Sequence, residues 1–285
     1  MTRAWFTMLI LGLILGGAVA QTTAPWGFCL RPVLPEVDVP TVTAAARLTE
    51  MERDGRRVSL RELNLAGRVA EHVTAGATLR QTHAHGRSVS TRYQADGWRA
   101  WVALCSVTPG EDLAEPGLFI LLDYLRDAAD IRYRTATTLF AAEPDVISYG
   151  GQAAMVLTNG RWSGHLRAGL YATELLGDTL TVVLLGGGWE APCTEMLTLE
   201  AALTGFRDDF QGRHYDAELA LGLRYAPSPR TMLALSGRYY PRGLPLAGAG
   251  LSPAAHIGAV YQTSATAGLM HDAVATLTLE GSLAF

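Results

Sequence analysis

The chain has no lysine: all 23 of its basic residues are arginine. They stand against 27 acidic residues, which gives a formal net charge of −4. A protein that binds nucleic acid needs a basic excess to neutralise phosphates, so this balance argues against nucleic acid as a partner. The base composition of the genome explains the absence of lysine most simply, and we draw no function from it.

Cysteine is also scarce. The sequence has only Cys29, Cys105 and Cys193, so at most one disulfide can form within the chain. Their spacing matches no metal-binding pattern. The run Gly186-Gly187-Gly188 lacks the Lys-Ser/Thr that completes a phosphate-binding loop. We therefore expect no metal and no cofactor.

Long hydrophobic runs are missing, apart from a short one at the N-terminus. Trp5 to Leu15 is too short for a comfortable membrane helix, which needs about 20 residues. With Arg3 before it and Ala18-Val19-Ala20 after it, the run predicts a signal peptide over residues 1–20. Residues 21–40 follow with prolines at 25, 32, 35 and 40, which exclude a regular helix or strand and predict an exposed extension or a small plug.

From about Thr41 to the end, hydrophobic residues alternate with polar ones, which predicts β-strands. The clearest hairpin spans 147–171 and turns at Asn159-Gly160. Symmetric pairing about that turn places Gln152 opposite Arg167. A second hairpin spans 214–240 and places Glu218 opposite Arg238. A third joins 118–126 to 131–141 through Asp127-Ala-Ala-Asp130 and places Asp123 opposite Arg134.

Weaker strands are expected elsewhere, with Asp54-Gly55 and Asp96-Gly97 as turns. They lie at 41–51, 57–65, 69–82, 87–95, 98–107, 178–187, 195–206 and 254–264. With the hairpins and the last strand these make about 15 candidates, but single-chain bacterial barrels prefer even numbers. Some weak candidates must be wrong or merged, and we predict 12 strands, with 10 or 14 as alternatives.

The apolar face of the second hairpin is bracketed by Tyr215 and Tyr225, ten residues apart. At about 3.3 Å per residue and a tilt near 45°, ten residues rise roughly 25 Å, the height of the apolar band of a membrane barrel. Backbone groups in hydrocarbon must all be paired, so such strands must form a closed sheet. The fold predicted is all-β: one antiparallel transmembrane β-barrel over residues 41–285. The expected aromatic girdle comprises Tyr215, Tyr225, Tyr239 and Phe285.

The last strand, 273–285, carries Leu277, Leu279, Leu283 and Phe285 on one face, with Gly281 as a weaker match. It resembles the C-terminal signature strand of bacterial outer-membrane β-barrel proteins, which end on an aromatic residue, usually Phe. The resemblance covers about 13 residues plus the signal peptide and identifies no subfamily. It implies a location in the bacterial outer membrane, contact with membrane lipid, and recognition of the strand by the barrel assembly machinery.

Two clusters could carry catalysis. His83, His85 and Ser88 could supply a nucleophile and its base, but no orienting acid is identifiable and the motifs of barrel lipid hydrolases are not reproduced. Asp208-Asp209 with His214 could mimic the rim of a barrel protease. Solvated loops explain both clusters more simply, so we expect no enzyme.

Charged residues on the polar face would line the lumen. The expected pore-lining residues are Arg134, Arg167, Arg224, Arg238, Asp123, Asp216 and Glu218. Arg167 and Arg224 have no obvious partner, so they are the better candidates for contact with solute, whereas Glu218 and Arg238 would form a structural ion pair. The favoured function is a porin-like passive channel or envelope component for small polar solutes. The alternatives are a barrel hydrolase acting on lipid or peptide, and a structural barrel that anchors or binds a cell-envelope layer, with a protein partner or a homo-oligomer possible.

Overall fold

The computed structural model describes residues 42–53, 56–70, 73–85, 90–105, 117–134, 139–143, 145–159, 162–175, 178–208, 214–228, 230–241 and 274–284. The expected signal peptide and the proline-bearing extension, residues 1–40, lie outside the described residues, as does the candidate strand at 254–264. The described residues contain strands and no helix; consequently none of them forms a helix long and apolar enough to cross a membrane.

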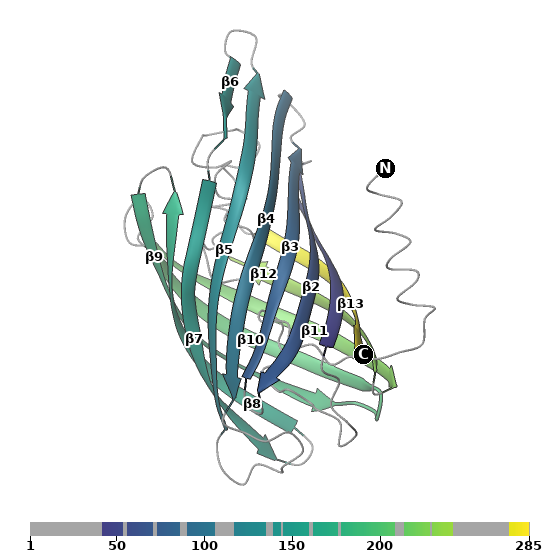
Figure 1. Cartoon of the computed structure of the whole chain (residues 1–285). Coiled ribbons are helices and arrows are strands. Elements are labelled where there is room, and N and C mark those ends of the chain that lie inside the picture. Colours follow the sequence, from purple (N-terminus) through teal and green to yellow (C-terminus); the bar gives the residue numbers. More distant parts are fainter. Residues whose placement is uncertain are drawn as a thin grey trace.

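The described residues form thirteen strands, and most of them are long (Figure 1). They are β1 (Val42–Arg53), β2 (Arg56–Ala70), β3 (Val73–His85), β4 (Ser90–Cys105), β5 (Gly117–Arg134), β6 (Leu139–Ala142), β7 (Asp145–Asn159), β8 (Trp162–Leu175), β9 (Asp178–Pro192), β10 (Leu197–Asp208), β11 (His214–Ser228), β12 (Thr231–Tyr240) and β13 (Val274–Ala284).

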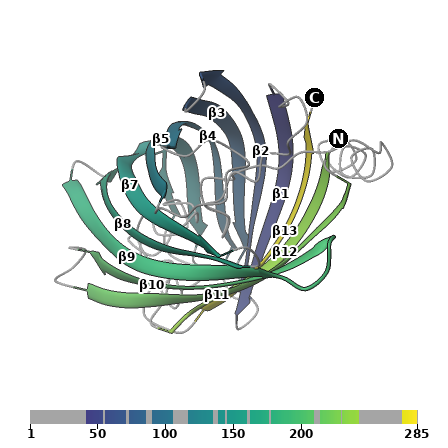
Figure 2. The same ribbon diagram turned by 90° about the horizontal axis from the view of Figure 1, so that it is seen from below.

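Twelve of these strands close into an antiparallel barrel, and the short β6 pairs only with the end of β5. Every strand of the barrel pairs with its neighbour along the chain, and β1 pairs with β13 to close the ring. Viewed along the barrel, β1 and β13 lie side by side (Figure 2). Closure leaves no open edge over the height of the barrel, as hydrocarbon demands of a spanning sheet. The predicted fold class and the predicted number of 12 strands are confirmed.

We call the end where β1 begins and β13 ends the proximal end, and the opposite end the distal end. The proximal connections include residues 71–72, 160–161 and 193–196. The distal connection between β12 and β13, residues 241–273, is by far the longest.

Two predicted turns are wrong. Asp96-Gly97 lies inside β4, which joins the candidate strands 87–95 and 98–107. Asp127-Ala-Ala-Asp130 lies inside β5, which joins 118–126 to the first residues of 131–141, whereas residues 139–141 belong to β6. The two segments are direct neighbours, because Gly97 pairs with Asp127 across the β4–β5 ladder. A Cβ at position 97 would collide with the Asp127 carboxylate. The glycine therefore makes room for a carboxylate inside the barrel and does not mark a turn.

Two of the three predicted cross-strand pairs have the correct faces but a displaced register, and the third pair is wrong. Gln152 pairs with Gly169 instead of Arg167, because the ladder continues through Asn159 and Trp162 and moves the centre of the turn by one residue. Arg238 pairs with Ala220 instead of Glu218, beyond a register shift between Tyr225 and Ser228. Asp123 and Arg134 cannot be opposite each other, because both belong to β5.

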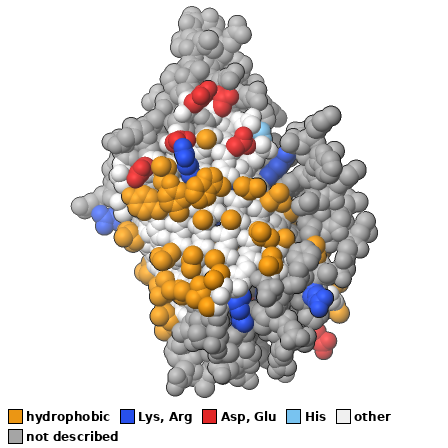
Figure 3. Space-filling model, in the orientation of Figure 1, with side chains coloured by type: hydrophobic (Ala, Val, Ile, Leu, Met, Phe, Trp, Pro, Cys, Tyr) orange, Lys and Arg blue, Asp and Glu red, His pale blue; other side chains and the backbone are white. Residues whose placement is uncertain are grey.

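The outer face is apolar and the inner face is polar over most of the barrel. Large exposed side chains such as Leu221, 65% exposed, alternate along the strands with buried inward ones such as Glu218. Figure 3 shows hydrophobic side chains across the middle of one side, with acidic side chains above them. Exposed Trp98, Tyr149 and Tyr239 lie toward the distal end of the outer face, whereas Trp189 and Tyr225 lie toward the proximal end. Aromatic residues at both borders of an apolar band are typical of a barrel in a bilayer.

Candidate functional site: the barrel lumen

The inner wall carries ion pairs that run between neighbouring strands. On one side, Arg47 of β1 bonds Glu280 of β13 through its Nε and Nη2 atoms, at 2.9 Å and 2.7 Å. The same guanidinium lies 3.4 Å from Glu62 of β2. Arg47 therefore joins the first, second and last strands where the barrel closes.

Further ion pairs of the inner wall lie on β3 and β5. Arg80 lies 4.0 Å from Glu62 and 3.5 Å from Asp127. Its side chain is only 3% exposed, so a loss of either carboxylate would leave a buried guanidinium poorly compensated. Gly97 allows this arrangement, because it leaves space on β4 for Asp127 to lie between β3 and β5.

A third set joins β4, β5 and β8. The Arg99 Nη2 atom donates to Asp123 at 2.9 Å, and Tyr171 donates its hydroxyl to the same carboxylate at 3.4 Å. All three side chains are buried. The true partner of Asp123 is thus Arg99, and not Arg134 as the sequence predicted.

Glu218 is the centre of a fourth set. Tyr240 donates its hydroxyl to Glu218 at 2.7 Å, and Arg238 lies 3.5 Å from the same carboxylate. The predicted Glu218–Arg238 ion pair is present, but it joins diagonal rather than opposite residues. Arg167, three strands away on β8, reaches Glu218 at 3.8 Å and donates to the Thr204 hydroxyl at 2.5 Å.

Arg224 completes the pattern near the proximal end. It lies 2.9 Å from Glu190 and 3.2 Å from Glu200. The expectation that Arg167 and Arg224 lack partners is therefore wrong. Pairing within each predicted hairpin missed these partners, because Glu218, Glu190 and Glu200 lie on strands outside the hairpin to which each arginine was assigned.

Sequence reasoning found only part of this network. The inward acids and arginines that it missed are Arg47, Glu62, Arg80, Arg99, Asp127, Glu190, Glu200 and Glu280. Their signal was available, since each lies in phase with the polar face of its strand. In these pairs six arginines meet seven carboxylates, so the described wall is close to neutral instead of rich in arginine.

The remaining predicted residues divide into three groups. Tyr225 and Tyr239 are exposed on the outer face, as expected of a girdle. Arg134, Tyr215 and Asp216 lie in strands, but their side chains are not among those described. Phe285 lies outside the described residues.

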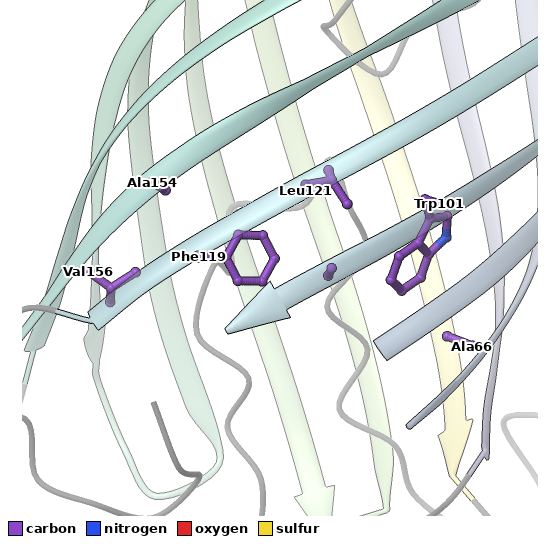
Figure 4. Close-up of a cluster of buried hydrophobic side chains, with 7 residues drawn as sticks. Ala66, Trp101, Phe119, Leu121, Ala154 and Val156 are labelled. Atoms are coloured by element: carbon purple, nitrogen blue, oxygen red, sulfur yellow. The ribbon is translucent and has the colours of Figure 1, made fainter. Parts of the chain in front are cut away.

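An apolar cluster occupies the proximal part of the same inner wall (Figure 4). Its members come from β2, β4, β5 and β7: Ala66, Trp101, Ala103, Phe119, Leu121, Ala154 and Val156. The Trp101 ring lies over Gly76 of β3, where a Cβ would be 2.5 Å from two ring carbons. Its indole N–H donates to Asn64 of β2 at 3.3 Å, so the ring spans two strands along the wall.

The two candidate catalytic clusters are not assembled by the described residues. His83 lies near the distal end of β3, but the side chains of His85 and Ser88 are not described. Asp208 and His214 pair across β10 and β11, and Asp209 lies outside the described residues. Among the described residues, no group of three His, Cys, Asp or Glu side chains could hold a metal ion.

A closed barrel with an apolar outer face and ion pairs inside defines a transmembrane β-barrel. No protein-family model and no curated protein sequence matches the chain. Solved structures of bacterial outer-membrane barrels do match its fold. The KdgM porin in complex with disordered oligogalacturonate has a TM-score of 0.50 and 9% identity, over 85% of this chain and 99% of that one.

Two further structures show the same likeness. The NanC porin has a TM-score of 0.50 and 10% identity, over 85% of this chain and 100% of that one. The translocator domain of the autotransporter NalP from Neisseria meningitidis has a TM-score of 0.52 and 16% identity, over 88% of this chain and 90% of that one. At such identities the likeness concerns the fold.

Proposed function

We propose that this chain is a porin-like barrel of the bacterial outer membrane that gives small polar solutes a narrow path. The observation that carries the proposal is the arrangement of charge: ionised side chains line the inside of a closed barrel whose outside is apolar. Charged rings along a pore are a common means of selecting solutes. The signal peptide and the C-terminal signature strand expected from the sequence, and the fold shared with two porins, support the same location and role.

The path is expected to be narrow and only weakly selective by charge. The paired side chains are between 1% and 14% exposed, so they are held against the wall and against one another. Six arginines against seven carboxylates leave little excess of either sign. Strong anion selectivity, which free arginines would give, is therefore not expected.

Planar-bilayer recording of the purified protein tests the proposal. We expect small, discrete current steps and a reversal potential near zero in a salt gradient. Glu218→Gln removes the carboxylate that Arg167 and Arg238 share. The reversal potential should therefore move toward the equilibrium potential of the anion. Glu174→Gln is the matched control and should leave the reversal potential unchanged, since Glu174 is exposed on the outer side of β8.

A structural barrel that anchors an envelope layer is the second candidate. The same low exposure of the lumenal charges favours it, since locked ion pairs can serve stability alone. If the pure, correctly folded protein gives no current steps in repeated recordings, the channel is ruled out and this second function is retained.

A further inference from the structure

One arginine of the inner wall is buried without a full set of hydrogen bonds. The Arg80 side chain is 3% exposed, and its two carboxylate neighbours both come closest to the Nε atom, Asp127 at 3.5 Å and Glu62 at 4.0 Å. Within the described strands, neither the Nε nor the Nη2 atom of Arg80 has a hydrogen-bond partner. Nearly all buried polar groups in proteins are satisfied, because a buried donor without an acceptor costs free energy. Arg80 therefore presents donors to an acceptor that the described wall does not supply.

A second donor lies next to Arg80. Asn64 on β2 pairs with Thr78 on β3, and Arg80 is two residues further along β3, so Asn64 and Arg80 are diagonal neighbours on the inner face. The orientation of the Asn64 amide is fixed by Trp101, whose indole N–H can only donate and bonds the Oδ1 atom at 3.3 Å. Thr78 donates its hydroxyl to the same oxygen at 2.9 Å. The Nδ2 atom is buried and has no partner among the described residues.

The surroundings of these donors favour an uncharged ligand. Glu62 and Asp127 already lie within 4.0 Å of the Arg80 guanidinium, so a bound anion would face two carboxylates. On the proximal side of Asn64 the inner face becomes apolar, beginning with Ala66 two residues along β2, and an ion beside apolar surface loses hydration without compensation. A hydroxyl group suits the site, because it can accept from Arg80 or Asn64 and donate to a carboxylate.

We propose that Arg80 and Asn64 form a binding site in the lumen for the hydroxyl groups of uncharged, polyhydroxylated solutes. The inference rests on the proposed function and deepens it, because it names the class of solute that the lumen takes: polyols in preference to organic acids of the same size. Asn64 is partly exposed on the inner wall, so the solute makes its first contact there. Glu62 and Asp127 supply the acceptors for the solute hydroxyls.

Saturation-transfer NMR measures this binding on the full-length protein, whether or not the barrel conducts. The barrel is folded in a detergent without hydroxyl groups, and its methyl protons are irradiated. The two probes are sorbitol and gluconate, which have carbon chains of equal length, but only gluconate carries a carboxylate. Saturation should pass to sorbitol and much less to gluconate.

Asn64→Asp is the sharpest variant, because it replaces the Nδ2 donor with an oxygen and keeps the oxygen that Trp101 and Thr78 bond. Transfer to sorbitol should fall on the order of fivefold, as expected for one lost hydrogen bond. Arg80→Lys keeps the positive charge but loses the planar set of donors, so it should lower the transfer as well. Gln81→Glu, on the outer face of β3, is the matched control: it adds the same charge as Asn64→Asp and should leave the transfer unchanged.

Three results would overturn the site. The first is no transfer to sorbitol, which would mean that water alone satisfies the donors. The second is equal transfer to sorbitol and gluconate, and the third is transfer that Asn64→Asp leaves unchanged. Each variant is first shown to be folded by its heat-dependent shift in electrophoresis, and if Asn64→Asp does not fold, Arg80→Lys takes its place in the test.

Bilayer recording separates this inference from the proposed function. Sorbitol binding by a barrel that gives no current steps supports the site and refutes the channel. Current steps from a protein that shows no transfer to sorbitol refute the site and leave the channel in place. If both hold, sorbitol should reduce the current more in the unchanged protein than in Asn64→Asp.

Discussion

At the scale of single residues, the lumen is built by large side chains that lie flat on glycines of the neighbouring strand. Trp101 over Gly76 is the clearest case, since the ring passes across β3 to reach Asn64 on β2. Tyr171 beside Gly150 and His165 beside Gly188 repeat the arrangement. Glycine in these strands is thus a packing partner, which explains its frequency on the inner face better than flexibility does.

Gly76→Ala should therefore destabilise the barrel. The new Cβ would lie 2.5 Å from the Trp101 ring, which is rigid and held by Asn64. We expect a loss of about 1–3 kcal/mol in the free energy of unfolding, as for overpacked cores. Urea unfolding in lipid vesicles, followed by tryptophan fluorescence, measures it.

Gly205→Ala is the control for that substitution. The nearest atom to a Cβ at position 205 is the Leu185 carbonyl oxygen at 3.7 Å, an ordinary contact. Its stability should change by less than about 0.5 kcal/mol. Equal effects of the two substitutions would show that the packing of Trp101 on Gly76 has been misjudged.

Among the carboxylates near β11 and β12, Glu218 should be the one whose replacement lowers the stability of the barrel most. It accepts a hydrogen bond from Tyr240 and faces both Arg167 and Arg238, so Glu218→Gln leaves two buried guanidiniums without their common counter-charge. We expect a loss of about 1–3 kcal/mol. The urea midpoint of Glu174→Gln should match that of the unchanged protein, and no difference between the two variants would refute a structural role for Glu218.

The alternation of the sequence predicted which residues face the lumen, but it could not predict which of them form ion pairs with one another. The polar phase of β11 and β12 correctly placed Glu218 and Arg238 inside. Glu218, the partner of Arg167, lies three strands away and Glu190, a partner of Arg224, lies two strands away, so these contacts depend on the curvature of the closed barrel. Curvature is a property of the whole sheet and leaves no mark in the sequence of one hairpin.

At the scale of elements, closure between β1 and β13 fixes the barrel. Thr49 pairs with Thr278, and their hydroxyls lie 2.9 Å apart inside the lumen. In a chain without its native cysteines, Thr49→Cys with Thr278→Cys should form a disulfide upon oxidation. Thr276 faces the same way but two residues off in register, so Thr49→Cys with Thr276→Cys should link far less. Equal linking, or linking only of the offset pair, would contradict the register of closure.

The false turns show why local signals fail in this barrel. Asp-Gly and clustered Asp-Ala residues are typical of tight turns in water. Here they mark a place where Gly97 on β4 and Asp127 on β5 face each other in the lumen and meet Arg80. A polar interior puts turn-like residues in the middle of strands, so hairpin signals overcount the strands. When the candidate strands on either side of each false turn are merged, the number of predicted strands comes closer to the 12 that form the barrel.

At the scale of the whole molecule, the all-β barrel could be predicted because the alternation extends through nearly the whole described chain. The girdle was predicted from Tyr215 and Tyr225, and the described residues add Trp98 and Tyr149 on the distal side and Trp189 on the proximal side. The apolar cluster inside the proximal wall could not be predicted. Its members alternate with apolar outward residues, so β4, β5 and β7 carry apolar side chains on both faces there.

The account depends above all on the outer face of the barrel being in contact with hydrocarbon. Spin labels along β11, placed one at a time at residues 219–223 of the protein in bilayers, test this most directly. Labels at Leu219, Leu221 and Leu223 should be accessible to oxygen, which dissolves in lipid, and protected from a water-soluble nickel complex. Labels at Ala220 and Gly222 should be much less accessible to oxygen, so that accessibility alternates with every second residue along β11. If the leucine positions are instead readily reached by the nickel complex, the barrel does not span a membrane and the account is wrong.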